Sequence, residues 1–361
     1  MKTPELQKFY KDKRILITGH TGFKGAWLTQ ILLEFGADVI GYSLESETDP
    51  NLFSLLKLKD KIEHHIDDIR DFKTLNAVVA KSKPDIIFHL AAQPLVRYSY
   101  DHPIYTYETN VIGTLNVLEA IRLNNIKAGV IITTDKVYKN IEQDITYNEE
   151  DPLGGHDPYS NSKACADLIV SSHIKSYFSK NDGLGSPLVA SVRAGNVIGG
   201  GDWAKDRLIP DAMRSFLLSN EDLVIRKPNA IRPWQHVFEP LYGYLLVGMH
   251  LYLRDRWAVG AWNFGPRDQD MQSVSVVLGQ IITHLKKGKY IVKEDETKHE
   301  AGNLKLSNKK AVKYLGWTPQ YDLNEAIRLT CMWYAKFYSK DADIAAFSQE
   351  QINNYFGLES K

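Results

Sequence analysis

The chain of 361 residues has only two cysteines, Cys165 and Cys331, and no apolar run approaches the roughly 20 residues that cross a bilayer. So few cysteines argue against a disulfide-stabilised fold and favour two buried thiols in a reducing cytoplasm. The first residues are charged and lack the apolar core of a signal peptide, so we expect a cytoplasmic protein. An excess of either charge is also lacking, since 44 basic residues balance 44 acidic ones. The charge therefore gives no reason to expect nucleic acid or a membrane as a partner.

The first half of the chain alternates short apolar runs with segments of helical periodicity. Strands are expected at 14–18, 37–43, 85–92, 128–134 and 188–197, and helices at 26–36, 109–125 and 160–178. Strands rich in valine and isoleucine that alternate with helices are typical of a parallel sheet covered on both faces. The expected fold class is therefore α/β, a Rossmann-type doubly wound sheet with right-handed crossovers.

The pattern changes after residue 198. Residues 199–210 are rich in glycine and charged residues and predict a loop. Much earlier in the chain, Gly36 is expected to cap the first helix at its C-terminus. Mixed helices and short strands follow the loop. We therefore expect a first domain of residues 1–198 and a smaller mixed α/β domain of residues 199–361. The second domain would close over the carboxyl ends of the strands, where ligands bind in open α/β sheets.

A glycine-rich motif, Gly19-His20-Thr21-Gly22-Phe23-Lys24-Gly25, lies between the first strand and the first helix. Its glycines permit a tight turn and let a pyrophosphate approach the backbone, and the helix start offers free N–H groups. In this context the motif predicts a dinucleotide cofactor, the alternative being a loop without a ligand. The second strand ends at Ser43 with neither the Asp typical of NAD sites nor an Arg for a 2′-phosphate, so NAD is favoured by default.

Tyr159 and Lys163 form a Y-x-x-x-K pair, one turn apart on an expected helix, so both side chains point the same way. A cation beside a phenol lowers the pKa of that phenol, which could then accept a proton from a substrate hydroxyl near neutral pH. The alternative is an ordinary solvated helix face. The position of the pair, after the fifth strand, favours a catalytic role.

The segment Thr133-Thr134-Asp135-Lys136 follows an expected strand, and the ends of parallel strands point into the ligand crevice. An Asp–Lys pair is more than an oxidation requires. It supplies an acid and a second ionisable group, which an elimination needs. The alternative is a charged β-turn, in which Asp is common.

Several segments together resemble the CDP-glucose 4,6-dehydratase family of extended short-chain dehydrogenases/reductases. The segments are GHTGFKG, HLAAQPLVRYSY, TTDKVY, YSNSK, RAGNVIGGGDW, IRPWQHV and HEAGNLKLSNKKAVKYLGW, and the resemblance runs from about residue 10 to about residue 335. Thr134-Asp135-Lys136 is its most specific element. Related dehydratases acting on dTDP-glucose and GDP-mannose carry Thr-Asp-Glu, so Lys136 leaves the usual glutamate base unaccounted for.

The resemblance implies dehydration of CDP-D-glucose to CDP-4-dehydro-6-deoxy-D-glucose with bound NAD, a step in deoxysugar synthesis of the O-antigen type. Thr134 would hydrogen-bond the sugar 4-hydroxyl, and Tyr159, paired with Lys163, would take its proton. Asp135 would protonate the departing 6-hydroxyl. Lys136 would remove the C5 proton if burial and neighbouring positive charges keep it neutral, and otherwise would stabilise the enolate.

The resemblance also implies the binding residues, with NAD held mainly by residues 1–198 and the nucleotide sugar mainly by residues 199–361. The residues expected at NAD are Gly19, Thr21, Gly22, Phe23, Lys24, Gly25, Ser43, Asp68, Ile69, Leu90, Ala91, Ala92, Asn110, Tyr159 and Lys163. Those expected at the nucleotide sugar are Arg97, Thr134, Asn196, Arg207, Arg232, Asn263 and Glu300. We expect no metal ion.

Two other functions stay open at this point. An NAD-dependent sugar-nucleotide epimerase would use Tyr159 and Lys163 but would have no task for Asp135. A non-catalytic dinucleotide-sensing protein could dispense with the Tyr–Lys pair. By analogy, helical segments near 106–124 and 160–178 would pair with their copies in a four-helix bundle, which predicts a homodimer or homotetramer.

Overall fold

The computed structural model describes residues 3–178, 185–293, 304–339 and 343–359. Its main sheet has seven parallel strands in the order β12-β7-β5-β4-β1-β2-β3. The strands are β1 (Arg14–Thr18), β2 (Asp38–Ser43), β3 (Glu63–Ile66), β4 (Ile86–His89), β5 (Ala128–Ile132), β7 (Leu188–Ala194) and β12 (Gly260–Phe264). This arrangement confirms the predicted Rossmann-type α/β class.

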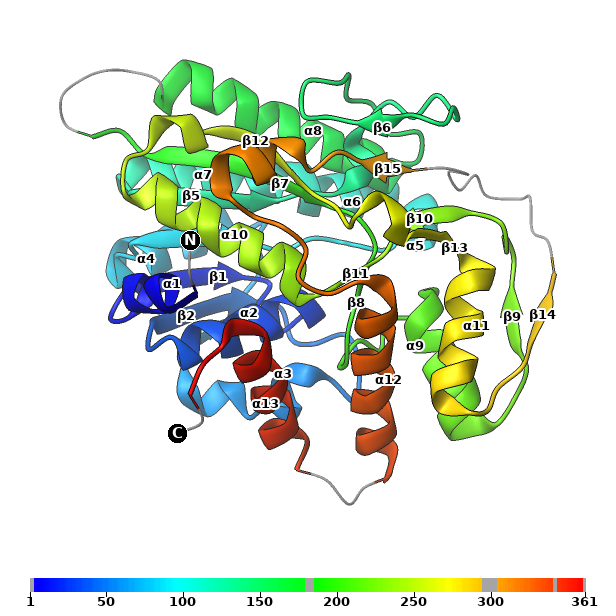
Figure 1. Cartoon of the computed structure of the whole chain (residues 1–361). Coiled ribbons are helices and arrows are strands. Elements are labelled where there is room, and N and C mark those ends of the chain that lie inside the picture. The colour runs from blue at the N-terminus through cyan, green and yellow to red at the C-terminus, as the bar shows by residue number, and fades with distance from the viewer. Residues whose placement is uncertain (1–2, 179–184, 294–303, 340–342, 360–361) are drawn as a thin grey trace.

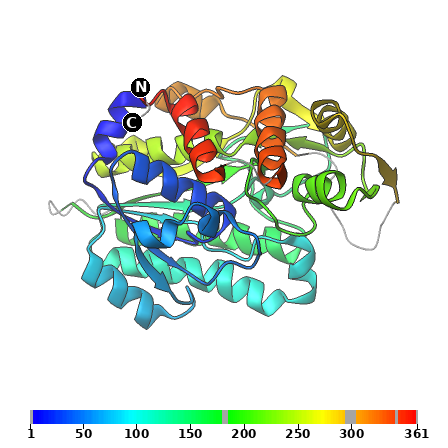
Figure 2. The same cartoon turned by 90° about the horizontal axis from the view of Figure 1, so that it is seen from below.

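Helices cover both faces of the sheet (Figures 1 and 2). One face carries α4 (Phe72–Ser82), α7 (Gly113–Leu123) and α8 (Pro158–His173), and the other carries α2 (Phe23–Glu34) and α10 (Phe238–Tyr252). Successive side chains of a strand point to opposite faces of the sheet, so the apolar residues of β1 can contact the helices on both faces. Ile15 and Ile17 pack in the cluster of α2 and α10, whereas Leu16 packs in the cluster of α4 and α7.

The remaining elements are shorter or lie outside the sheet. The helices are α1 (Thr3–Tyr10), α3 (Leu52–Leu55), α5 (Val96–Asp101), α6 (Pro103–Tyr107), α9 (Leu208–Met213), α11 (Val274–Leu285), α12 (Leu323–Ser339) and α13 (Ile344–Phe356). The strands are β6 (Thr146–Tyr147), β8 (Val197–Ile198), β9 (Leu223–Ile225), β10 (Ile231–Pro233), β11 (Gln235–His236), β13 (Met271–Ser273), β14 (Tyr290–Val292) and β15 (Lys305–Leu306). These short strands pair two by two beside the main sheet. The domain division at residue 198 stays a prediction. Two elements that follow residue 198 nevertheless belong to the main sheet and its helical layers: β12 is a strand of that sheet, and α10 packs on one of its faces.

Several local expectations differ in detail from the structure. The strand expected at 85–92 ends at residue 89, and the strand expected at 128–134 ends at residue 132. Residues 90–92 and the threonines 133 and 134 therefore lie in the turns that follow these strands. Phe35 caps α2, and Gly36 follows it with φ of 81°. Burial of both thiols is wrong for Cys165, which is only partly buried. It shares the outer face of α8 with Leu168, whose side chain is 55% exposed three residues further on.

A buried carboxylate ties the last helix to the centre of the fold. Glu239 of α10 accepts the backbone N–H of Gln320 and of Tyr321, and the hydroxyl of Tyr355 on α13 at 2.8 Å. Burial raises the pKa of Glu239 to about 7, although these hydrogen bonds oppose the shift. The carboxyl group therefore changes its charge near neutral pH while holding α13.

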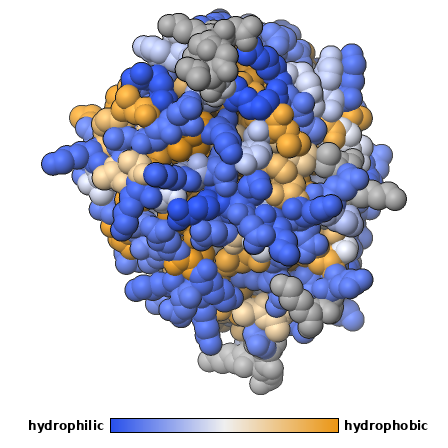
Figure 3. Space-filling model, turned by 90° about the vertical axis from the view of Figure 1, so that its left-hand side faces the viewer, coloured by the Kyte–Doolittle hydropathy of each residue, from blue (hydrophilic) through white to orange (hydrophobic). Residues whose placement is uncertain are grey.

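The surface in Figure 3 is mainly hydrophilic, with apolar residues scattered between the polar ones. Within the described ranges, the helices are too short or too polar to span a bilayer.

Candidate active site

The loop between β1 and α2 lies where the strand order changes direction, between β1 and β4. Gly19 has φ of 75°, and a Cβ there would lie 2.6 Å from the backbone nitrogen of Ala91. A Cβ on Gly25 would lie 2.1 Å from the carbonyl oxygen of Gly19. Gly22 caps α2 without a side-chain hydrogen bond, so the first N–H groups of the helix stay available to a phosphate. These features fit a dinucleotide pyrophosphate.

The carboxyl end of β2, beside this loop, offers hydroxyl groups. Thr21 Oγ1 lies 2.8 Å from Ser43 Oγ and donates to the carbonyl of Leu44. Asp68 follows β3 and binds the guanidinium of Arg70 at 2.7 Å, which lowers the pKa of the carboxyl group. Hydroxyls and a carboxylate at this edge suit the ribose of NAD better than a 2′-phosphate.

The turn after β5 carries the predicted acid. Thr134 donates its hydroxyl to Asp135 Oδ1 at 2.9 Å and caps a short 3-10 turn, η3 (Asp135–Val137). Asp135 is 1% exposed, and its Oδ2 has no hydrogen-bond partner among the described residues. Lys136 Nζ lies 3.9 Å from Asp135 Oδ1, and its side chain is 26% exposed. The turn thus presents a buried carboxyl group with one oxygen uncommitted.

Helix α8 brings Tyr159 and Lys163 to this turn. Burial raises the pKa of Tyr159 to about 12, and a hydrogen bond with Thr134 opposes that shift. Burial, and then the charge of Lys24, lower the pKa of Lys163 to about 7, and its Nζ donates to the carbonyl of Ile132 at 3.1 Å. The expected lowering of the Tyr159 pKa is wrong for the chain by itself, because burial penalises the phenolate more than the Thr134 hydrogen bond and the charge of Arg207 stabilise it.

Two further predicted residues reach the same centre from other elements. Burial, and then the charge of Arg207, lower the pKa of Lys24 to about 8. Arg207 donates to Asp202 at 2.8 Å, and its charge favours the phenolate of Tyr159. Tyr244 of α10, which sequence reasoning missed, is fully buried, and its hydroxyl has no hydrogen-bond partner within the described part of the chain. The ammonium of Lys24 lies 5.9 Å from its ring centroid.

The residues predicted for the nucleotide are more widely placed. Arg97 Nε lies 3.9 Å from Asp206 Oδ1, and Arg232 lies on β10 with only 9% exposed. Asn196 directly precedes β8. Glu300 lies outside the described residues. In the ranges that the structure does describe, no three His, Cys, Asp or Glu side chains gather as metal ligands.

Two predicted ligands are instead hydrogen-bonded within the fold. Asn263 on β12 is fully buried, accepts the hydroxyl of Tyr138 at 2.7 Å and donates to the carbonyl of Tyr147 at 3.2 Å. Asn110 accepts the backbone N–H of Gln93 at 2.8 Å and donates to its carbonyl. Asn110 thereby holds the loop that follows residues 90–92. Direct ligand contact by either amide stays a prediction.

A parallel sheet with a glycine loop at its switch point, faced by a Tyr–Lys pair on one helix, defines an enzyme of the extended short-chain dehydrogenase/reductase class. Residues 16–330 match the family model described as GDP-mannose 4,6-dehydratase. The chain is also 46% identical to the CDP-glucose 4,6-dehydratase of Salmonella typhimurium, over 98% of its own length and 99% of the relative's. It belongs to this family of nucleotide-sugar 4,6-dehydratases, which confirms the resemblance seen in its motifs.

Solved structures share the fold at lower identity. The UDP-glucose 4-epimerase of Thermus thermophilus, in complex with NAD, aligns with a TM-score of 0.77 at 22% identity, covering 89% of this chain and 99% of that one. The dTDP-glucose 4,6-dehydratase of Bacillus anthracis, also in complex with NAD, aligns with a TM-score of 0.74 at 24% identity, and the alignment covers 93% of this chain and 99% of that one. Epimerases and dehydratases therefore share this architecture, and the choice between them depends on the site.

Proposed function

We propose that this protein dehydrates CDP-D-glucose to CDP-4-dehydro-6-deoxy-D-glucose and water, with NAD as its cofactor. The observation that carries the proposal is Asp135, a buried carboxyl group with one uncommitted oxygen beside Tyr159. An acid at this place has a task in elimination and none in epimerisation. The reaction is a step toward deoxysugars of the O-antigen type. We place it in the cytoplasm, where the two free thiols stay reduced.

The first half of the reaction needs Thr134, Tyr159 and Lys163. Thr134 hydrogen-bonds the 4-hydroxyl of the sugar, and Tyr159 removes its proton as C4 is oxidised. The charge of Arg207 favours the phenolate that this step requires. Bound NAD supplies the hydride acceptor at C4 and the hydride donor at C6, so the reaction has no net redox change.

The second half needs an acid at O6 and a base at C5. Asp135 gives its proton to the departing 6-hydroxyl through Oδ2, the oxygen that Thr134 does not bind. Lys136 is the nearest cation to Asp135 on the turn, at 3.9 Å. Its neutral form removes the C5 proton, or its charged form stabilises the enolate while another base acts.

A panel of nucleotide-glucoses, read by product mass, tests the proposal. Loss of one water from CDP-glucose supports it, whereas an unchanged mass with an altered sugar indicates an epimerase. Binding of NAD without any sugar turnover indicates a dinucleotide sensor. Substrate deuterated at C4 should yield product with deuterium at C6, and loss of that deuterium to solvent would contradict the mechanism.

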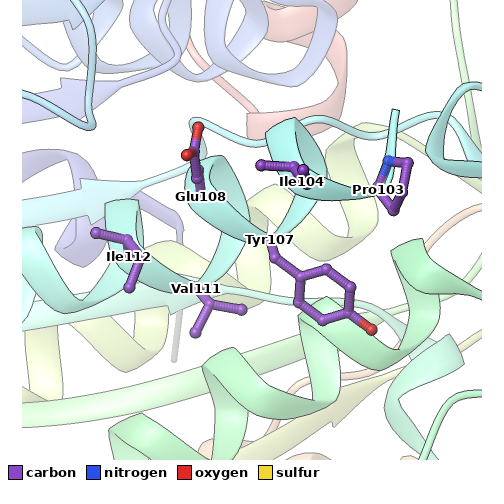
Figure 4. A pocket seen from close by; sticks show the side chains of 6 residues that line it. All are labelled: Pro103, Ile104, Tyr107, Glu108, Val111 and Ile112. Carbon is purple, nitrogen blue, oxygen red and sulfur yellow. The ribbon is translucent and has the colours of Figure 1, made fainter. Parts of the chain in front are cut away.

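A second copy of the chain is the partner we propose, seated on α6, α8 and the π-helical turn η2 (Glu108–Ile112). A surface depression of about 370 Å³ there is lined by Pro103, Ile104, Tyr107, Glu108, Val111 and Ile112 (Figure 4). Ile104 is 74% exposed, and Leu168 on α8 is 55% exposed. Apolar side chains exposed on two neighbouring helices favour a four-helix interface between copies. Ile104→Asp should shift the sedimentation coefficient toward the monomer.

A further inference from the structure

A buried ion pair contacts both ends of residues 133–138, the catalytic turn that carries Thr134 and Asp135. Asp167 of α8 binds Arg193 of β7 through two hydrogen bonds, from Nε at 2.8 Å and from Nη2 at 2.9 Å. Each residue is 3% exposed. Taking two charges out of water costs about as much as their attraction returns, so such a pair adds little stability over an apolar packing. The role of the pair is therefore to fix the positions of the residues that it binds.

The carboxylate of Asp167 accepts four donors in all. Besides Arg193, the hydroxyl of Thr133 donates to Oδ2 at 2.9 Å, and the hydroxyl of Ser191 donates to Oδ1 at 2.8 Å. Each oxygen therefore has two donors, and the buried charge is fully hydrogen-bonded. The two hydroxyls differ in position, because Thr133 begins the catalytic turn and Ser191 lies within β7.

The same pair holds both ends of the catalytic turn. Thr133, at its start, is bound by Asp167, and Tyr138, at its end, accepts a hydrogen bond from Arg193 Nη1 at 2.8 Å. One helical turn before Asp167, Lys163 donates to the carbonyl of Ile132. Helix α8 thus binds two successive residues immediately before Thr134 and Asp135.

We propose that Asp167 is a positioning residue for the dehydration, which through Thr133 fixes the turn of Thr134 and Asp135 against the helix of Tyr159. The inference rests on the proposed function. One sugar must meet Tyr159 at C4 and Asp135 at C6, and these residues come from different elements. A misplacement of about 1 Å between reacting groups costs about 100-fold in rate.

The test removes one hydroxyl at a time from the same carboxylate. Thr133→Val deletes the donor on the catalytic turn, and the matched control Ser191→Ala deletes the donor within the sheet. We expect Thr133→Val to lower kcat for CDP-glucose dehydration about 10- to 100-fold, with KM within about twofold of wild type. Ser191→Ala should leave kcat within about twofold, while both variants lower the melting temperature by similar amounts. Thr133→Ser restores the hydroxyl and should restore kcat.

Three results would overturn the inference in distinguishable ways. Equal kcat values for Thr133→Val and Ser191→Ala, in a background where wild type dehydrates CDP-glucose, would leave Asp167 with a purely structural role. A wild-type protein that releases no water from CDP-glucose would refute the proposed function itself, and the positioning role with it. A loss of kcat in Thr133→Ser as large as in Thr133→Val would assign the effect to the methyl packing of Thr133.

Discussion

Replacing Asp135 by asparagine removes the proposed proton donor from the catalytic turn and leaves the shape of the turn almost unchanged. The asparagine carbonyl can still accept the Thr134 hydroxyl, now 2.9 Å from Oδ1, and its amide takes the place of the uncommitted Oδ2. The contact between Lys136 Nζ and Asp135 Oδ1 is long at 3.9 Å, and the lysine side chain is 26% exposed, so losing this contact costs less than about 1 kcal/mol of stability. The melting temperature should therefore barely change.

Catalysis by the Asp135→Asn variant should change far more, because an amide cannot protonate the departing 6-hydroxyl. Loss of a positioned acid slows the step that needs it by about 10²–10⁴, which is about 3–5 kcal/mol of barrier. Oxidation at C4 does not use Asp135, so rapid mixing with CDP-glucose should show the absorbance of reduced cofactor rising and persisting while water loss lags. Dehydration at the wild-type rate without a lasting signal would remove Asp135 from the mechanism and favour the epimerase alternative.

Three further predictions follow from the site and the core. Tyr159→Phe should lower turnover about 10²–10⁴ in steady-state kinetics with NAD affinity nearly unchanged, and normal turnover would contradict its role as base. In Gly25→Ala the new Cβ would meet the Gly19 carbonyl at 2.1 Å, so calorimetry should show NAD binding at least about tenfold weaker, whereas Gly22→Ala, with a contact of 3.4 Å, is the milder control. The pKa of Glu239 is about 7 in the fold against 4.5 for the free group, so its contribution to stability is fully present below pH 4.5 and is lost as the pH rises through 7. Compared with Glu239→Gln, wild type should lose up to about 3 kcal/mol of unfolding free energy between pH 4.5 and 8, and a pH-independent difference would refute this.

The parts of the fold that sequence predicts well are those coded locally. The apolar run of β1 and the glycines after it specify a strand and a turn within a dozen residues, and the spacing of Tyr159 and Lys163 places both on one helix face. Tyr244 could not be found this way, because it lies in α10, whose residues are almost all buried and apolar. Only the packing of α10 under the sheet brings its hydroxyl near the site.

The pKa values of the site residues and the hydrogen bonds between distant segments could not be predicted from the sequence either. The pKa of Tyr159 depends on its burial among elements far apart in the chain, and no local pattern records that burial. Asn263 lies in a motif that suggested a nucleotide contact, yet its amide is bound by Tyr138 and the carbonyl of Tyr147. The contacts of Asn263 depend on β12 lying beside β7 in the sheet, which no local pattern in the sequence predicts.

The place of β12 at the edge of the main sheet has a consequence for synthesis on the ribosome. Its residues Gly260–Phe264 pair with Ala190–Ala194 of β7, so the sheet stays incomplete until residue 264 of 361 has emerged. Until then the backbone of β7 has an open edge, and the part of the sheet face that α10 covers stays bare until α10 ends at residue 252. Open edges and bare apolar faces invite pairing between nascent chains. The window in which this protein needs protection from aggregation therefore spans the translation of residues 195–264, and it closes when β12 docks.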